Sequence, residues 1–128
     1  MSMILCDTNI LIEFYKNTPE VIGELCEIGQ HQLAVSTITQ AELYFGALDK
    51  TELQKIKRHL SLIFVIPVDN HISMQFISLM EKYSLSHKLS IPDALIASTA
   101  LVHQQELYTL NDKDFRFISG LRLYNPRM

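Results

Sequence analysis

Acidic side chains follow short apolar stretches at several points of the chain, and they are the residues best suited to chemistry. In chain order they are Asp7, Glu42, Asp93, Asp112 and Asp114. In an α/β fold the carboxyl ends of parallel strands share one edge of the sheet, where ligands bind. Carboxylates gathered there repel one another unless a divalent cation neutralises them, and oxygen atoms are the ligands that Mg²⁺ prefers. The pattern predicts a Mg²⁺ site, with Mn²⁺ as the alternative, and with it phosphodiester chemistry.

The apolar periodicity predicts which elements position these residues. Short apolar runs predict strands, and apolar residues at helical spacing predict amphipathic helices between them. Strands alternating with helices are typical of a three-layer α/β domain with a mainly parallel central sheet of four to five strands, here a single domain over residues 1–128. The predicted strands are 4–6, 33–35, 63–68 and 107–110, with 121–124 as a possible fifth, and the predicted helices are about 9–16, 19–28, 39–48, 53–60, 70–84 and 92–104.

Composition limits the class of protein. The chain has 128 residues, of which 48% are hydrophobic and 20% charged, as in ordinary globular domains. Its apolar runs are far shorter than the roughly 18 residues of a membrane span, and its N-terminus has no basic region before an apolar one, so we expect no membrane segment and no signal peptide. Cys6 and Cys26 are expected to be buried free thiols, which fits a reducing cytoplasm. The net charge of −3 differs from the positive net charge typical of nucleic-acid-binding proteins, although acidic metal ligands contribute to it.

Each acidic residue also has a purely structural interpretation, as a helix cap. Asp7 can cap the helix that follows it, and Asn111 or Asp112 can cap the last short helix. The spacings of Thr39 with Glu42 and of Ser90 with Asp93 both fit a capping box. The two interpretations are compatible, because the positive end of a helix stabilises a carboxylate. Metal binding is favoured because all of these positions follow strand-type segments and should meet at one sheet edge.

Four segments of the chain, in order, resemble the motifs of PIN-domain ribonucleases. The first contains Cys6-Asp7-Thr8-Asn9, the second Thr39-Gln40-Ala41-Glu42, the third Ile91-Pro92-Asp93-Ala94 and the fourth Thr109-Leu110-Asn111-Asp112-Lys113-Asp114-Phe115. The resemblance covers essentially the whole chain at family-like spacing. The single-domain length is most similar to that of VapC toxins of bacterial and archaeal toxin–antitoxin pairs.

The resemblance assigns roles residue by residue. Asp7 and Asp93 match the main direct metal ligands, and Glu42 matches a residue that binds through water or a second metal. Asp114 is favoured for the fourth acidic position, with Asp112 and Asn111 as second choices. Thr8 and Asn9 match polar residues that support the metal site.

The resemblance also implies an activity and partners. It implies a Mg²⁺-dependent endoribonuclease that hydrolyses RNA by a metal-activated water, acts as the toxin of a type II pair, is inhibited by a cognate antitoxin and commonly forms a homodimer. Candidate RNA contacts are Lys16, Lys55, Lys57, Arg58 and Lys88. Ser36 and Thr37 are either phosphate contacts or cap residues, and His87 and His103 are expected to be surface residues rather than catalytic bases. The apolar residues Ile10, Phe14, Tyr44, Phe45 and Leu48 are either partner contacts or core.

Two other functions fit parts of the pattern. A receiver-type or haloacid-dehalogenase-type phosphoryl-transfer domain also places aspartates at strand ends, but such a phosphatase needs Asp-x-Asp, and here Asp7 is followed by Thr8-Asn9. A catalytically degenerate PIN-fold binding module is the second alternative. The intact set of Asp7, Glu42 and Asp93 argues against it.

Overall fold

A parallel sheet forms the centre of the molecule, in a computed structural model that describes residues 3–126. Its strands lie in the order β3-β2-β1-β4, and each neighbouring pair is parallel. The register is set by pairs such as Ile4 with Leu33 and Cys6 with Tyr108. The bounds are β1 Ile4–Cys6, β2 Leu33–Ser36, β3 Phe64–Ile66 and β4 Glu106–Tyr108. The predicted α/β class and parallel sheet are confirmed.

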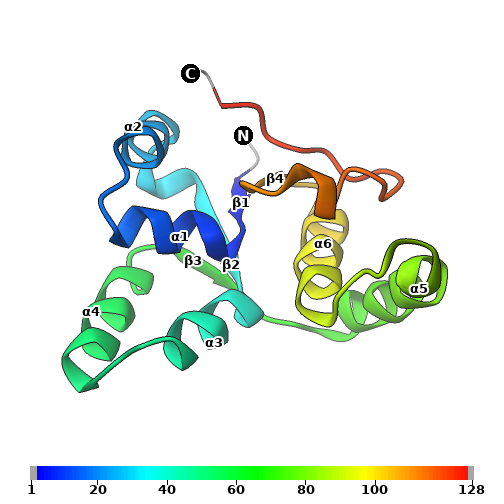
Figure 1. Ribbon diagram of the computed structural model, residues 1–128, viewed down its shortest axis with the longest axis horizontal. Coiled ribbons are helices and arrows are strands. Elements are labelled where there is room, and N and C mark those ends of the chain that lie inside the picture. The colour runs from blue at the N-terminus through cyan, green and yellow to red at the C-terminus, as the bar shows by residue number, and fades with distance from the viewer. Residues whose placement is uncertain (1–2, 127–128) are drawn as a thin grey trace.

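Helices cover both faces of this sheet, which gives the three layers (Figure 1). On one side lie α1 to α4, and on the other lie α5 and α6. Their bounds are α1 Thr8–Tyr15, α2 Pro19–Ile28, α3 Thr37–Phe45, α4 Lys50–Leu60, α5 Asn70–His87 and α6 Ile91–His103, with short 3₁₀ helices η1 Gln30–Gln32 and η2 Asp112–Asp114. None of the helices among residues 3–126 is long and apolar enough to cross a membrane.

The alternating direction of side chains along β1 explains why each face of the sheet has its own hydrophobic core. Successive side chains of a strand point to opposite faces. Leu5 is fully buried in the cluster under α5 and α6, whereas Cys6 is buried in the cluster under α1, α2 and α4. The central strand is thus buried on both faces, as expected of a parallel sheet between helix layers.

The strand order determines where a ligand site can form. The chain proceeds outwards from β1 to β2 and β3, and then returns to place β4 on the other side of β1. Connections therefore leave β1 and β4 in opposite directions and open a crevice between the carboxyl ends of these two strands. Asp7 follows β1 and η2 follows β4, so both lie at this crevice.

Several predicted element bounds are corrected by the structure. The strand predicted at 63–68 is Phe64–Ile66, the one predicted at 107–110 is Glu106–Tyr108, and the helices predicted at 39–48 and 53–60 are Thr37–Phe45 and Lys50–Leu60. Two further corrections concern the C-terminal segment and α5. The possible fifth strand at 121–124 is reduced to a single parallel bridge between Leu107 and Leu123, within a C-terminal segment that runs beside β4 without a continuous ladder. Helix α5 continues to His87 rather than ending near residue 84, and Lys88 then ends it in the left-handed conformation at φ 56°. Helices commonly end with such a residue, although usually it is glycine.

Two smaller predictions were also wrong. Cys26 is exposed, because α2 buries Val21, Glu24 and Leu25 and turns Cys26 to the solvent. Thr39 does not cap a helix, because α3 begins two residues earlier, at Thr37, and its cap is Ser36, whose hydroxyl accepts a hydrogen bond from the Ile38 backbone N–H. Ser90 does cap α6, as expected, by accepting from the Asp93 backbone N–H at 3.2 Å.

Candidate active site

Asp7 is the most constrained acidic residue of the site. It ends β1, caps α1 and is only 6% exposed. One carboxylate oxygen accepts from the Thr8 backbone N–H at 2.7 Å, and the other accepts from the Thr109 hydroxyl at 2.7 Å. The second bond joins residues 102 positions apart across the crevice between β1 and β4. The carboxylate of Asp7 is therefore held in one orientation at the switch point of the sheet.

A pair of threonines positions Glu42. Glu42 lies on α3, which begins at the carboxyl end of β2. The Thr8 hydroxyl lies 2.6 Å from Glu42 Oε1 and 3.0 Å from the hydroxyl of the buried Thr39. Because a hydroxyl has one proton, Thr8 can donate to the carboxylate while accepting from Thr39. The first turn of α1 is thereby tied to α3.

Asp93 lies in the first turn of α6 and is half-buried. Its pKa is raised from 3.8 to about 6, first by burial and then by the negative charges of Asp7, Asp114 and Glu42, against a smaller lowering by Ser90. The pKa of Asp7 is raised by burial as well, and the charges of Glu42 and Asp114 add to this, while its hydrogen bonds from Thr109 and Thr8 oppose it. These mutual effects show that the four carboxylates, which come from four separate segments, share one electrostatic environment.

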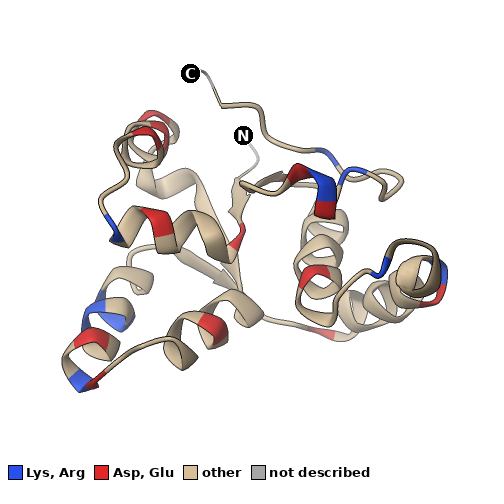
Figure 2. Cartoon of the chain, in the orientation of Figure 1, with Lys and Arg blue, Asp and Glu red and all other residues tan. Residues whose placement is uncertain are grey.

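Within residues 3–126, no cationic side chain forms an ion pair with any of the four carboxylates. The one ion pair formed within residues 3–126 joins Lys16 to Glu13, at 3.8 Å. Figure 2 shows acidic positions at the start of α1 and on α3, α6 and η2, with one basic position between the two acidic positions of η2. An uncompensated group of this kind favours protonation or a cation.

The donor set suits a hard divalent cation. All four side chains offer carboxylate oxygens, and nearby negative charges raise the pKa of Asp7 and of Asp93. Within the described part of the chain no three acidic, histidine or cysteine side chains are close enough to form a complete coordination shell. Mg²⁺ does not require one, since it keeps several waters and typically binds through one or two carboxylates together with substrate phosphates. Asp7 and Asp93 fit that need, with Glu42 and Asp114 at the periphery.

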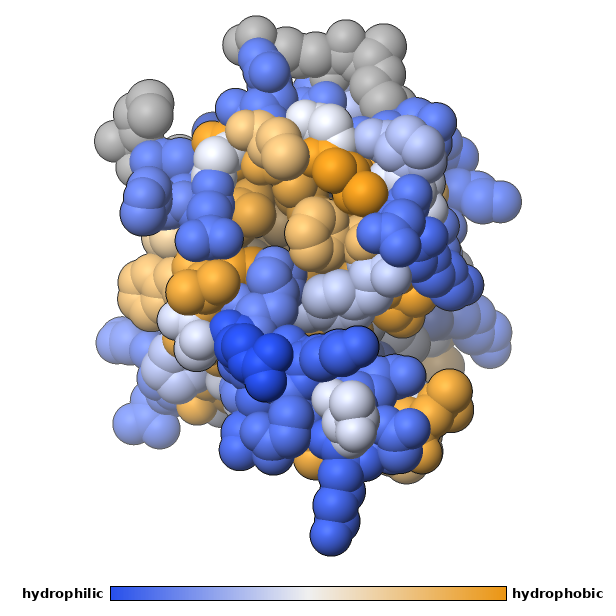
Figure 3. All heavy atoms as spheres, turned by 90° about the vertical axis from the view of Figure 1, so that its left-hand side faces the viewer, coloured by the Kyte–Doolittle hydropathy of each residue, from blue (hydrophilic) through white to orange (hydrophobic). Residues whose placement is uncertain are grey.

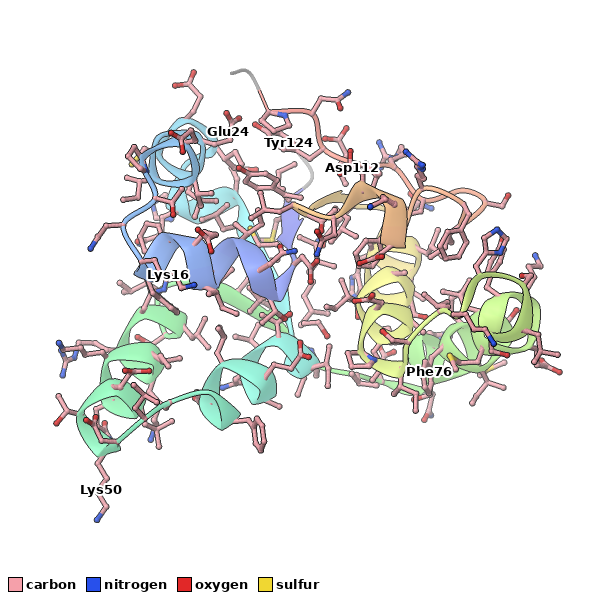
Figure 4. The ribbon with its side chains drawn as sticks, viewed as in Figure 1. Lys16, Glu24, Lys50, Phe76, Asp112 and Tyr124 are labelled. Atoms are coloured by element: carbon pink, nitrogen blue, oxygen red, sulfur yellow. The ribbon has the colours of Figure 1, made fainter. Side chains whose placement is uncertain are left out.

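The effects of Asp112 and Asp114 on the pKa values of Asp7 and Asp93 distinguish between these candidates for the fourth acidic residue of the site. Asp114 raises the pKa of both Asp7 and Asp93, whereas the charge of Asp112 is not among the causes for either. Figure 4 places Asp112 on the upper side of η2, away from α6. The Asn111 backbone N–H donates to Thr109 at 3.1 Å, but no side-chain hydrogen bond of Asn111 caps η2. The structure favours Asp114, and its role as a ligand stays a prediction.

Two residues that orient the carboxylates of the site were not assigned that role from the sequence. Thr109 and Thr39 are both buried, and their hydroxyls orient Asp7 directly and Glu42 through Thr8. The signal available in the sequence was that both threonines belong to the second and fourth motif segments, close to acidic residues. The side-chain oxygen of Asn9 accepts from the Leu110 backbone N–H at 3.4 Å and so contacts the loop after β4, while its role in supporting a metal stays a prediction.

The hydroxyls of Ser36 and Thr37 are engaged in the fold. Ser36 is fully buried and caps α3, while Thr37 donates to the carbonyl of Ile66 at 3.1 Å. Ser36 is therefore a cap residue, whereas Thr37 is exposed and caps no helix, so a phosphate contact by Thr37 stays a prediction. His87 and His103 are both exposed. The candidate RNA contacts Lys16, Lys55, Lys57, Arg58 and Lys88 are all exposed, and only Lys16 of these forms an ion pair within residues 3–126.

The apolar candidates divide between core and surface. Ile10 is fully buried, and Phe14 and Tyr44 pack partly against the core under α1, α2 and α4. Phe45 is 93% exposed and Leu48 is 86% exposed, so these two have no packing role within the chain.

Comparison with known proteins agrees with this geometry. A family model described as the PIN domain matches residues 4–121. Ribonuclease VapC10 of Mycobacterium tuberculosis is 30% identical over 122 residues, which cover 94% of this chain and 91% of the relative. Ribonuclease VapC1 of Methanocaldococcus jannaschii is 28% identical over 127 residues, covering 97% and 88%. A toxin–antitoxin complex from Klebsiella pneumoniae contains a chain that superposes with a TM-score of 0.79 at 36% identity, covering 92% of this chain and 94% of that one.

The matches extend over nearly the whole chain and include every segment that carries an acidic residue of the site. The resemblance inferred from the four motifs is confirmed, and the chain belongs to the PIN-domain family.

Proposed function

We propose that this chain is a metal-dependent endoribonuclease and the toxin component of a type II toxin–antitoxin pair. The observation that carries the proposal is the convergence of Asp7, Glu42, Asp93 and Asp114 at one crevice with no cationic partner among the described residues. Relatives over the full length of the chain are named ribonucleases, which supports the same reaction class.

The acidic residues of the site would have different roles in binding the cation. Asp7 and Asp93 would hold Mg²⁺ or Mn²⁺, while Glu42 and Asp114 would hold its water ligands or a second ion. Bound there, the cation would lower the pKa of a water molecule and offset the charge that builds on the scissile phosphate. Thr109 and Thr8 fix the carboxylates of Asp7 and Glu42 before the substrate arrives. Such preorganisation keeps the carboxylates from reorienting during the reaction.

Cleavage of RNA by the purified protein tests the proposal. Total bacterial RNA is incubated with the chain in Mg²⁺, in Mn²⁺ and in EDTA, beside Asp7→Asn and an Asp112→Asn control. We expect discrete fragments only where metal is present, a rate at least about a hundredfold lower for Asp7→Asn, and little change for Asp112→Asn. Intact RNA in every lane contradicts the proposal and favours the degenerate binding module.

We also propose that an antitoxin covers the face formed by α1 and α2. Figure 3, which looks at this side, shows apolar atoms gathered in its upper half and hydrophilic atoms around and below them. Ile12 on α1 is 40% exposed there, and Phe14 and Ile28 are only partly covered. A contiguous apolar surface of this kind marks interaction sites. The structure from Klebsiella pneumoniae is titled a toxin–antitoxin complex, which supports a partner of the same class.

A second copy of the chain is the partner we propose for Phe45 and Leu48. Both lie at the end of α3 or in the link to α4 and are almost fully exposed. Burying them against a symmetry-related pair would form the isologous contact typical of homodimers.

A further inference from the structure

Three aromatic rings form a stack at the end of α5, outside the carboxylate site. The His87 imidazole lies parallel to the Phe117 ring, with centroids 4.2 Å apart and planes 8° apart. Tyr83 meets both rings edge-on, at 5.2 Å from Phe117 and 5.6 Å from His87. We call Tyr83, His87 and Phe117 the aromatic stack.

The aromatic stack is rigid on its inner side and open on its outer side. Tyr83 is buried, and its hydroxyl accepts from the Ser119 backbone N–H at 3.1 Å. Phe117 is half-buried, whereas His87 is exposed and its Nδ1 lies 2.8 Å from the Ser86 hydroxyl. The imidazole is thus held by stacking and by a hydrogen bond, and its exposure leaves part of the ring accessible to a further planar group.

Basic residues surround the aromatic stack. Lys88 directly follows His87, Arg116 directly precedes Phe117, and Lys82 Nζ lies 6.0 Å from the centroid of the Tyr83 ring. All three side chains are exposed, and none forms an ion pair within residues 3–126. Figure 2 shows basic positions along the end of α5, the link to α6 and the segment after η2. We call Lys82, Lys88 and Arg116 the basic rim.

The aromatic stack lies close along the chain to the carboxylate site. Phe117 is three positions after Asp114, and Asp93 is six positions after His87. A fully extended chain spans at most about 3.6 Å per residue, so the distances between these backbones are at most about 11 Å and about 22 Å. A strand bound in the crevice can therefore reach the stack.

The other basic surface lacks an open ring. Lys55, Lys57 and Arg58 lie on α4, where the nearest ring is that of His59. His59 is half-buried, stacked on Phe14 at 5.0 Å and bonded through Nδ1 to the Tyr15 hydroxyl. That surface offers charge alone, whereas the aromatic stack with its basic rim offers charge and a stacking face.

We propose that the aromatic stack and basic rim form a subsite for single-stranded RNA, in which an unpaired base stacks on His87 and the adjoining phosphates contact Lys82, Lys88 and Arg116. Aromatic and histidine rings receive unpaired bases in this way, and stacking is tolerant of sequence because every base has a π face. The inference rests on the proposed nuclease function and adds a binding subsite to it.

Binding of a short fluorescein-labelled oligoadenylate tests the subsite by fluorescence anisotropy. The measurement uses the full chain with Asp7→Asn, so that the probe is not cut. We expect His87→Ala to weaken binding about tenfold, His87→Phe to retain it because the ring remains, and the exposed His103→Ala to have no effect. Lys88→Asn, a residue type that tolerates positive φ, should weaken binding and lower the slope of log affinity against log salt by about 1, whereas Lys50→Gln on α4 should not.

The possible results distinguish failure of the proposed RNA subsite from failure of the proposed nuclease function. Equal affinities for the parent and His87→Ala overturn the subsite, as does equal affinity for a fully paired probe. A chain that cuts RNA with metal but does not bind oligoadenylate also overturns it and leaves the nuclease function standing. A chain that neither binds nor cuts RNA overturns both.

Discussion

Asp93 is the residue whose chemistry depends most on pH. Its pKa of about 6 lies above the ordinary 3.8 because burial and the nearby charges of Asp7, Asp114 and Glu42 disfavour the ionised form. The folded chain therefore holds this proton more tightly than the unfolded chain. The carboxyl favours folding most below about pH 4, and that contribution is lost as the pH rises through about 6.

Replacing this carboxyl by a neutral amide should stabilise the metal-free chain. In EDTA at pH 7 we expect Asp93→Asn to raise the free energy of unfolding by about 1 kcal/mol, a value reduced for partial solvent screening, and at pH 4 to change it little. Mg²⁺ should then stabilise the parent at pH 7 and leave the variant unaffected. Urea titrations at both pH values measure this. A variant less stable than the parent at pH 7 in EDTA is incompatible with repulsion among these carboxylates.

Thr109 is the residue that we expect to matter most among those without charge. Its hydroxyl donates to Asp7 and accepts from the Asn111 backbone N–H, so Thr109→Val leaves both groups without that partner. We expect a loss of about 1–2 kcal/mol in stability and a 10- to 100-fold loss in metal affinity or cleavage rate. Thr109→Ser keeps the hydroxyl and serves as the control. Parent-like cleavage by the valine variant would show that Asp7 needs no such orientation.

At the level of secondary structure, the N-terminal ends of helices position much of the site. Asp7 caps α1, Ser90 caps α6 one turn before Asp93, and α3 carries Glu42 from the end of β2. Asp7 and Asp93 thus lie at helix N-termini at the carboxyl edge of the sheet, where the peptide dipoles favour negative charge, whereas Glu42 lies further along α3.

Removing the cap of α6 should affect both stability and chemistry. Ser90→Ala deletes the side-chain acceptor for the Asp93 backbone N–H, and we expect a loss of about 1 kcal/mol in the free energy of unfolding. Ser90 also lowers the pKa of Asp93, so the acid limb of the cleavage profile should move to higher pH in the variant. Ser90→Thr provides the matched control. An acid limb that stays in place would separate the cap from the carboxylate.

The sequence patterns predicted the presence of the helices and strands better than the residues at which they begin and end. The parallel sheet and the acidic strand ends were predictable because apolar runs and periodic helices reflect burial directly. The end of α5 was not, because Lys88 rather than a glycine adopts the left-handed conformation there. The hydrogen bonds of Thr109 and Thr39 depend on contacts between segments distant in the chain, which no local pattern encodes.

Across the whole molecule, surface apolar side chains are the feature that the isolated fold leaves unexplained. Phe45 is 93% exposed at the end of α3, although most aromatic side chains of the described chain are at least partly covered. Glu24 and Tyr124, by contrast, are joined by a hydrogen bond that holds the C-terminal segment against α2 (Figure 4). The segment around Tyr124 thus packs within the domain, while Phe45 remains open to a partner.

Substitution of Phe45 should change assembly and not folding. We expect Phe45→Ser to alter the free energy of unfolding of the isolated chain by less than about 0.5 kcal/mol, since the ring has little to pack against. Sedimentation should show the parent associating and the variant remaining a single copy. Leu85→Ser, which changes a side chain 89% exposed on α5, should associate like the parent. A parent that stays a single copy at every concentration rules out the proposed dimer.

We propose that Asp7 and Asp93 hold a divalent cation at the crevice between β1 and β4. Titration of Mn²⁺ into the chain, with free ion measured by electron paramagnetic resonance, tests this without knowledge of the RNA target. We expect saturable binding by the parent and by Asp112→Asn, and its loss in Asp7→Asn and in Asp93→Asn. Absence of saturable binding by the parent, or binding that survives in both Asp7→Asn and Asp93→Asn, would show that these two carboxylates do not hold the cation.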